Sequence, residues 1–139
     1  MRSPLLLLAL GSIAACASPL PAVDPQQAWV DLDTQTPGGK LVMAERLDNQ
    51  RLSDGRFFQV TPGSHELEVR FDFEIYGGGM NIMNAPQERL CYLTVRYDHF
   101  EAGQRYRLEA RSLGFNASAR LYNAKREIVA EDRLVNCVP

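Results

Sequence analysis

The chain has 139 residues and a mass of 15.6 kDa, which is enough for one domain with a hydrophobic core and too short for two ordinary domains. Its composition, with 45% hydrophobic and 23% charged residues, is typical of a globular protein. The formal net charge is −2 and the isoelectric point is near 5.7, so the chain offers no basic field for nucleic acid phosphates. We therefore expect no nucleic acid partner.

Residues 1–15 have the layout of a secretory signal peptide. A positive start at Arg2 precedes a mostly apolar run that begins at Leu5 and continues to Ala15. This run is shorter than the roughly 20 apolar residues that a transmembrane helix needs. We expect residues 1–15 to be removed from the mature protein.

The signal ends in Ile13-Ala14-Ala15-Cys16, which resembles the lipobox of bacterial lipoproteins. The resemblance implies cleavage before Cys16, which would then carry a thioether-linked diacylglycerol and an amide-linked acyl chain. Two or more acyl chains hold a protein stably at a membrane. Residues 17 and 18 lack the aspartate that retains enteric lipoproteins in the inner membrane, so the resemblance implies an outer-membrane anchor that faces the periplasm.

Residues 16–27 predict a lipidated cysteine followed by a tether. Three prolines between Ala17 and Gln27 favour an extended, semi-rigid spacer, which spans at most about 36 Å. From Ala28 the pattern changes to that of strands. We therefore expect a single domain over residues 28–139.

Cys91 and Cys137 are the two cysteines that remain once Cys16 is acylated. An oxidising compartment favours a disulfide between them. No C-x-x-C spacing supports a redox or metal-binding role for the pair.

Alternation of apolar and charged residues is clearest over 64–76, where five apolar residues from Leu67 to Ile75 face away from the charged ones. Turn signals rich in Gly, Pro, Asn and Asp separate this segment from weaker strand patterns. No segment has a long helical period. The sequence therefore predicts an all-β fold, an antiparallel β-sandwich or partly closed barrel of seven or eight short strands. The other predicted strands cover 28–33, 41–47, 57–60, 90–97, 105–111, 117–122 and 127–137.

Charge distinguishes two of these strands. The outward residues of 105–111 are mostly basic, whereas those of 66–74 are mostly acidic. Opposite charges on adjacent strands support each other modestly. The pattern favours pairing of these two strands, unless the intervening segment 90–97 separates them in the sheet.

Residues 60–69 read V-T-P-G-S-H-E-L-E-V and resemble the V-x-P-G-x-H-x-L-x-V core of PEGA-type domains. Pro62 and Gly63 suit a tight turn before a strand, and His65 suits hydrogen bonding within it. The whole chain is similar to small envelope lipoproteins of proteobacteria, pseudomonads among them. The motif is structural in that family, so the resemblance implies no catalytic residue. The chain departs from the PEGA pattern in its glycine-rich segment after Tyr76.

That glycine-rich segment is the most unusual stretch of the sequence. Its apolar residues either fold back onto the domain or contact a partner, because flexible methionine-containing loops adapt to irregular surfaces. A weaker alternative is a Cu(I) site of Met80 and Met83, completed by His65 or His99. The candidate partner-binding loop comprises Gly77, Gly78, Gly79, Met80, Ile82 and Met83.

His65 follows Ser64 and His99 follows Asp98, but neither pair has the third group that a catalytic triad needs. We expect no enzyme, cofactor or resident metal. The leading hypothesis is a lipid-anchored interaction or structural module of the envelope, with the membrane and an envelope protein as partners. The alternative is binding of a small ligand, glycan or copper ion through the glycine-methionine loop or an aromatic face drawn from Trp29, Phe57, Phe58, Tyr92, Tyr97, Phe100, Tyr106, Phe115 and Tyr122.

Overall fold

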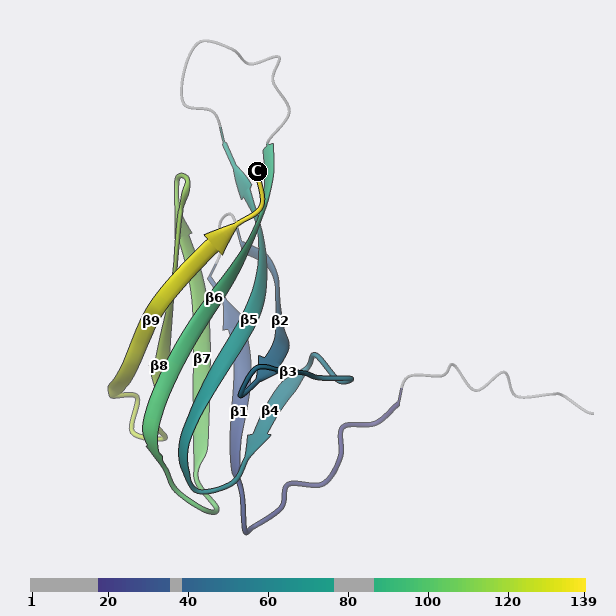
Figure 1. The fold of residues 1–139 in the computed structure, drawn as a ribbon, viewed down its shortest axis with the longest axis vertical. Helices are drawn as coiled ribbons and strands as arrows, with labels where there is room; N and C mark the ends of the chain where they lie inside the picture. Colours follow the sequence, from purple (N-terminus) through teal and green to yellow (C-terminus); the bar gives the residue numbers. More distant parts are fainter. Residues whose placement is uncertain (1–17, 36–38, 77–86) are drawn as a thin grey trace, which may run out of the picture.

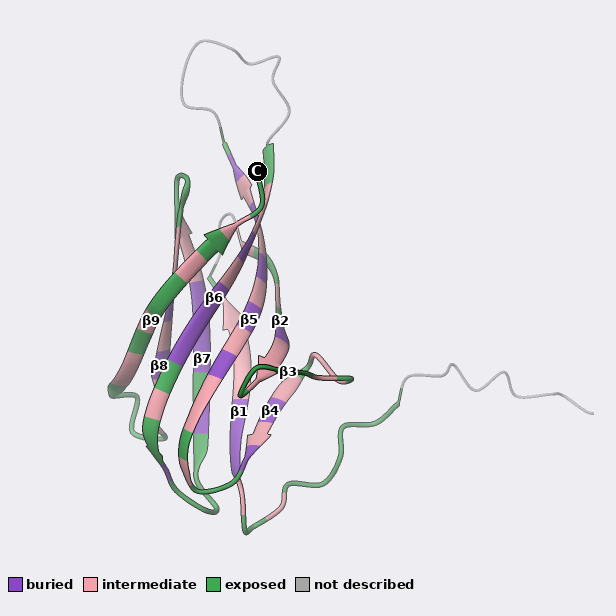
Figure 2. Cartoon of the chain, viewed as in Figure 1, coloured by how far each residue is buried: buried purple, intermediate pink, exposed green. Residues whose placement is uncertain are grey.

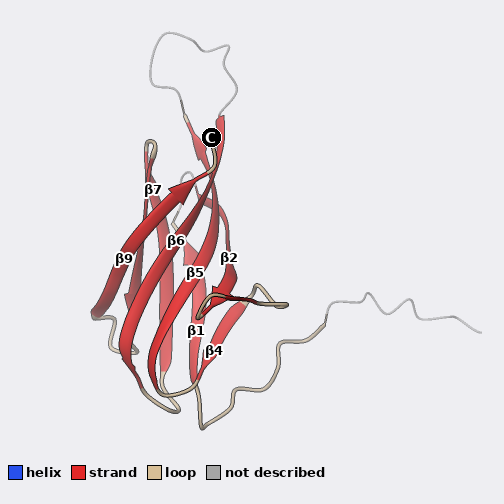
Figure 3. Ribbon diagram, in the orientation of Figure 1, coloured by secondary structure: helices blue, strands red, loops and turns tan. Residues whose placement is uncertain are grey.

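The computed structural model describes residues 18–35, 39–76 and 87–139, and these residues form an all-β fold without a helix (Figure 3). Accordingly, they include no helix that could cross a lipid bilayer. The strands are β1 (Ala28–Thr34), β2 (Gly39–Leu47), β3 (Gln50–Arg51), β4 (Phe57–Val60), β5 (Gly63–Ile75), β6 (Gln87–Phe100), β7 (Arg105–Leu113), β8 (Asn116–Tyr122) and β9 (Ile128–Cys137).

All eight strands that the sequence predicts are present, with ends that differ by three residues or fewer. The ninth strand, β3, was not predicted, because two polar residues are too short to show any alternation. It forms the far side of a tight turn at Asp48 and Asn49, whose φ angles are 48° and 65°. Asp and Asn tolerate such left-handed backbone, which a two-residue hairpin requires.

The strands form one open mixed sheet in the order β3-β2-β5-β6-β9-β8-β7-β1-β4 (Figure 1). The prediction of a wholly antiparallel sheet is wrong at one pair, since β1 runs parallel to β7 and antiparallel to β4. Alternation in a sequence determines which face of a strand is buried, and leaves its partner and direction open.

The sheet curls around one core. In Figure 1, β9, β6, β5 and β2 lie in front of β8, β7, β1 and β4. The backbone N–H of Ala44 in β2 donates to the carbonyl oxygen of Gly55, 2.8 Å away, which brings the segment before β4 beside β2. Apolar side chains from both halves therefore pack into a single cluster, whose largest members are Phe58, Phe71, Phe73, Leu67, Leu93, Leu108 and Leu121.

Strands β5 and β6 provide the longest ladder of the sheet. The inward residues of β5 from Leu67 to Phe73 are fully buried, and alternate with half-buried charged residues (Figure 2). Burial of each large apolar side chain stabilises the fold by about 1.5–3 kcal/mol. The buried face of β5 therefore carries an apolar residue at every second position, and this makes the strand clear in the sequence.

The predicted disulfide is confirmed. Cys91 of β6 and Cys137 of β9 lie directly opposite each other in the ladder and are bonded. The next residue, Val138, donates its N–H to the carbonyl oxygen of Leu90 at 2.8 Å. The end of the chain is therefore held against β6.

Residues 18–27 precede the first strand and are bonded to the domain at Ser18, Asp24 and Gln27. The Arg56 guanidinium donates to the carbonyl oxygen of Ser18 at 2.7 Å. Nearer the domain, Asp24 N–H donates to Gln59 Oε1 at 3.2 Å, and Gly103 N–H donates to the Gln27 carbonyl oxygen at 2.9 Å. These bonds hold the last part of the predicted tether at the end of the molecule where β1 begins.

Candidate functional site

A groove of about 550 Å³ runs along the outer face of β7. The alternation of β7 explains its character, since Tyr106, Leu108 and Ala110 are buried in the core while the residues between them face outward. The neighbouring strands β1 and β8, and the loop between β8 and β9, complete its walls. We call this feature the β7 groove, and its charged lining residues are Asp31, Arg105, Arg107, Glu109, Arg111 and Arg126.

Arg105 and Asp31 form a bidentate pair at one end of the groove. Arg105 Nε and Nη2 donate to the two carboxylate oxygens at 2.6 and 2.9 Å, and Trp29 Nε1 donates to Asp31 Oδ1 at 3.0 Å. The Arg105 guanidinium holds the pKa of Asp31 below its ordinary value, and Asp31 in turn raises the pKa of Arg105. The same guanidinium lies 5.6 Å from the Trp29 ring centroid.

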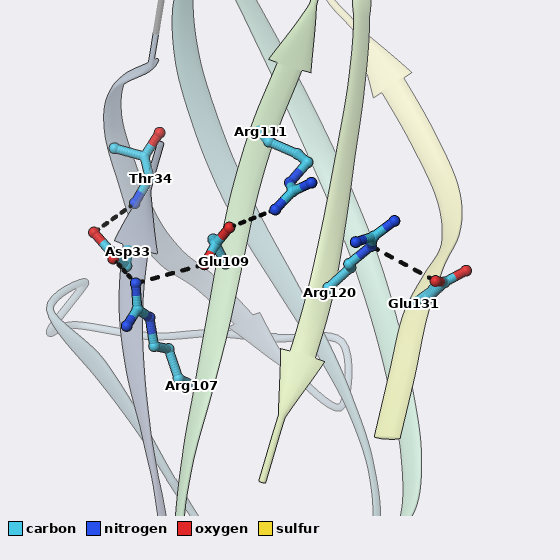
Figure 4. Close-up of polar contacts among 7 residues, drawn as sticks. All are labelled: Asp33, Thr34, Arg107, Glu109, Arg111, Arg120 and Glu131. Carbon is cyan, nitrogen blue, oxygen red and sulfur yellow. Dashed lines mark hydrogen bonds and ion pairs between the residues drawn. The ribbon is translucent and has the colours of Figure 1, made fainter. Parts of the chain in front are cut away.

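Glu109 lies at the centre of the groove floor with a side chain that is only 9% exposed. Arg111 Nη2 donates to Glu109 Oε1 at 2.8 Å, and Arg107 Nη2 lies 3.5 Å from the other carboxylate oxygen (Figure 4). Arg107 also pairs with Asp33 of β1, whose second oxygen accepts the Thr34 N–H. Glu109 raises the pKa of Arg111. These bonds offset the free-energy cost of burying the charged Glu109 carboxylate.

The loop between β8 and β9 holds Arg126 at the rim of the groove. Asn123 Oδ1 accepts the N–H groups of Lys125 and Glu127 at 3.0 and 2.9 Å. The Arg126 N–H donates to the Asn123 carbonyl oxygen at 3.0 Å, and the Arg126 backbone has a φ of 63°. None of the ion pairs between described residues includes Arg126.

The prediction that the basic strand pairs with the acidic one is wrong. Three strands separate β5 from β7 in the sheet. The acids of β5 instead meet cations of β2 and β9, with Lys40 at 2.8 Å from Glu74, Arg46 at 3.7 Å from Glu68, and Arg133 at 3.8 Å from Glu66. Arg105 and Arg107 of β7 meet the acids of β1, because the parallel pairing places those side chains next to each other.

The Pro62-Gly63 turn joins β4 to β5, and Gly63 has a φ of 111°, which a residue without a Cβ adopts easily. His65 lies just after the turn. Its Nε2 is 2.7 Å from the Thr61 carbonyl oxygen, and its Nδ1 is 2.6 Å from Asp48 Oδ2. The ring therefore links this turn to the one between β2 and β3.

The adjacent pairs Ser64–His65 and Asp98–His99 do not form catalytic dyads. Ser64 Oγ donates to Asp98 Oδ1 at 2.7 Å, whereas His65 contacts Asp48 and Thr61. The His99 ring packs edge-on against Tyr97, with centroids 6.0 Å apart. Among the described residues, no three His, Cys, Asp or Glu side chains gather closely enough to hold a metal ion.

Four of the nine aromatic candidates are buried and cannot form a stacking platform. Phe58, Phe100 and Tyr106 are buried, and Trp29 is 2% exposed because it stacks on Phe57 at 4.3 Å. Phe115, by contrast, is exposed at the β7–β8 turn. Cys16 and the candidate partner-binding loop from Gly77 to Met83 lie outside the described residues.

Comparison of the chain with protein-family models, curated proteins and solved structures gave no match. The β7 groove combines residues from β1, β7 and the loop after β8, so its parts are far apart in the sequence. The one sign of the β7 groove in the sequence was the alternation of arginines over residues 105–111. Glu109 lies on the same strand, whereas Asp31 and Asp33 of β1 become partners through the strand order.

Proposed function

We propose that the protein is a lipid-anchored lipoprotein of the outer membrane, facing the periplasm, that acts as a non-enzymatic interaction module. The lipobox at Cys16 and the proline-containing segment that follows it support the anchor. The resemblance of residues 60–69 to PEGA-type domains, and of the chain to small proteobacterial envelope lipoproteins, supports the role in the envelope. We further propose that the curled sheet is a partly closed barrel, because the Ala44–Gly55 backbone bond links β2 to the segment just before β4, and these two strands lie near opposite ends of the strand order.

The observation that carries the interaction role is a group of exposed apolar side chains at one end of the molecule. We call it the apolar tip; it comprises Leu113 and Phe115 at the β7–β8 turn, Tyr76 after β5, and Val138 after β9. Leu113 is 84% exposed and Phe115 is 59% exposed. The Arg89 guanidinium of β6 lies 5.8 Å from the centroid of the Phe115 ring, which places the turn beside the start of β6.

The apolar tip lies opposite the end where the tether joins. In Figure 1 the chain enters β1 at the lower end, whereas the β7–β8 turn and the C-terminus lie at the upper end. An anchor at Cys16 would therefore leave the tip directed away from the tether. Exposed apolar groups at such a place are typical of a protein docking surface. Ile75 of β5 and Gln87 of β6 pair at this same end.

Substitution of Cys16 tests the anchor. We expect Cys16→Ser to abolish incorporation of labelled palmitate in cells and to release the protein from the membrane fraction. The control is Cys137→Ser, which removes a different cysteine and leaves the lipidation site in place. Membrane retention and labelling of Cys16→Ser would contradict the anchor.

A photoreactive residue tests the docking surface. We expect a photocrosslinker at Phe115, in cells, to capture one specific envelope protein. The matched control is a crosslinker at Ile128, which is 48% exposed and begins β9 at the end of the molecule away from the tip. Equal adducts at both positions, or none at Phe115, would contradict a docking role for the tip.

A further inference from the structure

We propose that the β7 groove binds a small organic anion through a carboxylate or phosphate group, with Arg107, Arg111 and Arg126 as its contacts. The groove lies on the outer face of the sheet and the apolar tip lies at one end, so this site is independent of the proposed docking function. The planar guanidinium group suits both oxyanions, because it presents parallel N–H donors that match their oxygens.

Within residues 18–35, 39–76 and 87–139, the charges around the groove leave one cation without an acidic partner. Four arginines and two acids line it, and Asp33 stands just outside. Arg105 is occupied by Asp31, and the Arg107–Arg111 pair is occupied by Asp33 and Glu109. Arg126 remains, and the closed loop from Asn123 to Glu127 holds it at the rim. The groove is therefore a positive region on a protein whose net charge is negative.

The arginines on the groove floor keep donors that the protein does not use. Arg107 and Arg111 both reach Glu109 through Nη2. Arg111 Nε is buried and has no hydrogen-bond partner among the described residues, so a ligand would meet the Nη groups of Arg111, of which Nη2 also bonds Glu109. The side chain of Arg107 is half exposed and that of Arg111 is one-third exposed, so both can be reached from the groove. Glu109 fixes the two guanidinium groups in place before any ligand arrives.

The groove has the size and walls of a site for a small molecule. Its volume of about 550 Å³ lies within the range of roughly 300–1,000 Å³ that is common for such sites. Tyr122 and Asn123 line it and provide a ring face and an amide. These groups suit a sugar-sized body attached to the oxyanion, and the groove is larger than a free inorganic ion needs.

Calorimetry with three matched sugars tests the proposal on the full-length protein purified in detergent. The probes are glucose 6-phosphate, glucuronate and neutral glucose, each titrated in low-salt buffer. We expect binding of at least one of the two anions and none of glucose. The stronger of the two identifies phosphate or carboxylate as the preferred group. Absence of binding by both anions, or equal binding of glucose, would overturn the proposal.

Two variants identify the groove as the site. Arg126→Asn removes the unpaired cation, and asparagine tolerates the left-handed backbone at this position. Arg111→Lys keeps the positive charge beside Glu109 but removes the planar guanidinium group and its parallel N–H donors. We expect each to weaken binding about tenfold, as loss of a charged hydrogen bond does. The control Arg51→Gln removes one positive charge from the highly exposed side chain of β3. Unchanged affinity in both groove variants, or an equal loss in Arg51→Gln, would refute the site.

Discussion

His65 links two turns, and its partner in the other turn, Asp48, lies seventeen residues away in the chain. Its ring nitrogens face the Thr61 carbonyl oxygen and the Asp48 carboxylate, and its side chain is only 13% exposed. Asp48 also accepts the Glu66 N–H at 2.8 Å. Burial opposes ionisation of Asp48, but the Glu66 and His65 contacts outweigh it, so the pKa of Asp48 lies below its ordinary value. Single residues of this kind hold the turns in register with the strands.

We expect His65→Ala to lower the free energy of unfolding by about 1 kcal/mol, because it removes two hydrogen bonds of which one reaches a half-exposed carboxylate. Urea denaturation measures the change. His99→Ala is the control, since its ring makes an edge contact with Tyr97. An equal decrease in the free energy of unfolding in both variants would contradict the linking role of His65.

Asp31 predicts an acid dependence of stability. Arg105 holds its folded-state pKa below the ordinary value of 3.8. The folded protein therefore binds fewer protons than the unfolded chain near this pH, and the Arg105–Asp31 contribution is complete above 3.8 and declines as the pH falls through the folded-state pKa. We expect the wild-type advantage over Asp31→Asn, measured by urea denaturation, to shrink between about pH 5 and pH 2. An advantage that stays constant over this range would contradict the assignment.

At the scale of elements, β9 depends on the bonds at its end. Its residues are mostly exposed or half-buried, and its ladder with β6 has an irregularity between Thr94 and Val95 of β6. The Cys91–Cys137 bond and the Val138–Leu90 hydrogen bond close the ladder at the C-terminal end. A strand with so little buried surface gains more from a covalent link than β5 would.

Removal of the disulfide is therefore expected to cost stability. The bonded cysteines are 46 positions apart, and the chain-entropy model gives roughly 4 kcal/mol for a loop of this length. We expect the Cys91→Ser, Cys137→Ser double variant to unfold at clearly lower urea concentration than wild type. The control is wild-type protein with dithiothreitol, which should approach the variant. An unchanged midpoint would show that β9 is held by packing alone.

At the scale of the whole molecule, one core serves both halves of the curled sheet. Residues of β4, β5, β6, β7 and β8 belong to the same apolar cluster, although β4 and β5 lie far apart in the strand order. A shared core of this kind favours unfolding as one cooperative unit. The outer faces, by contrast, carry the β7 groove and the apolar tip.

Two leucines of β7, one in the shared core and one on the outer surface, test the difference between the two regions. We expect Leu108→Ala, at a fully buried position, to cost about 2–5 kcal/mol because it leaves a cavity in the shared core. Leu113→Ala at the tip removes the same atoms from an 84% exposed position, and should change stability by less than about 0.5 kcal/mol. Thermal and urea unfolding measure both. Similar losses in the two variants would mean that Leu113 packs against the domain in solution.

Patterns in the sequence were enough to predict the all-β class, the positions of eight strands, the buried face of β5 and the disulfide. Each is local or chemical: alternation marks a half-buried strand wherever it pairs, and the disulfide was predicted because we expect the protein to reside in an oxidising compartment. The tertiary structure alone decided the strand order, the parallel pairing of β1 with β7, and the places where Arg126 and Leu113 lie. Backbone hydrogen-bonding groups are the same along every strand, so alternation cannot identify the strand with which a given strand pairs. Asp31 and Asp33, the β1 acids that pair with Arg105 and Arg107 beside the groove, follow from that partner.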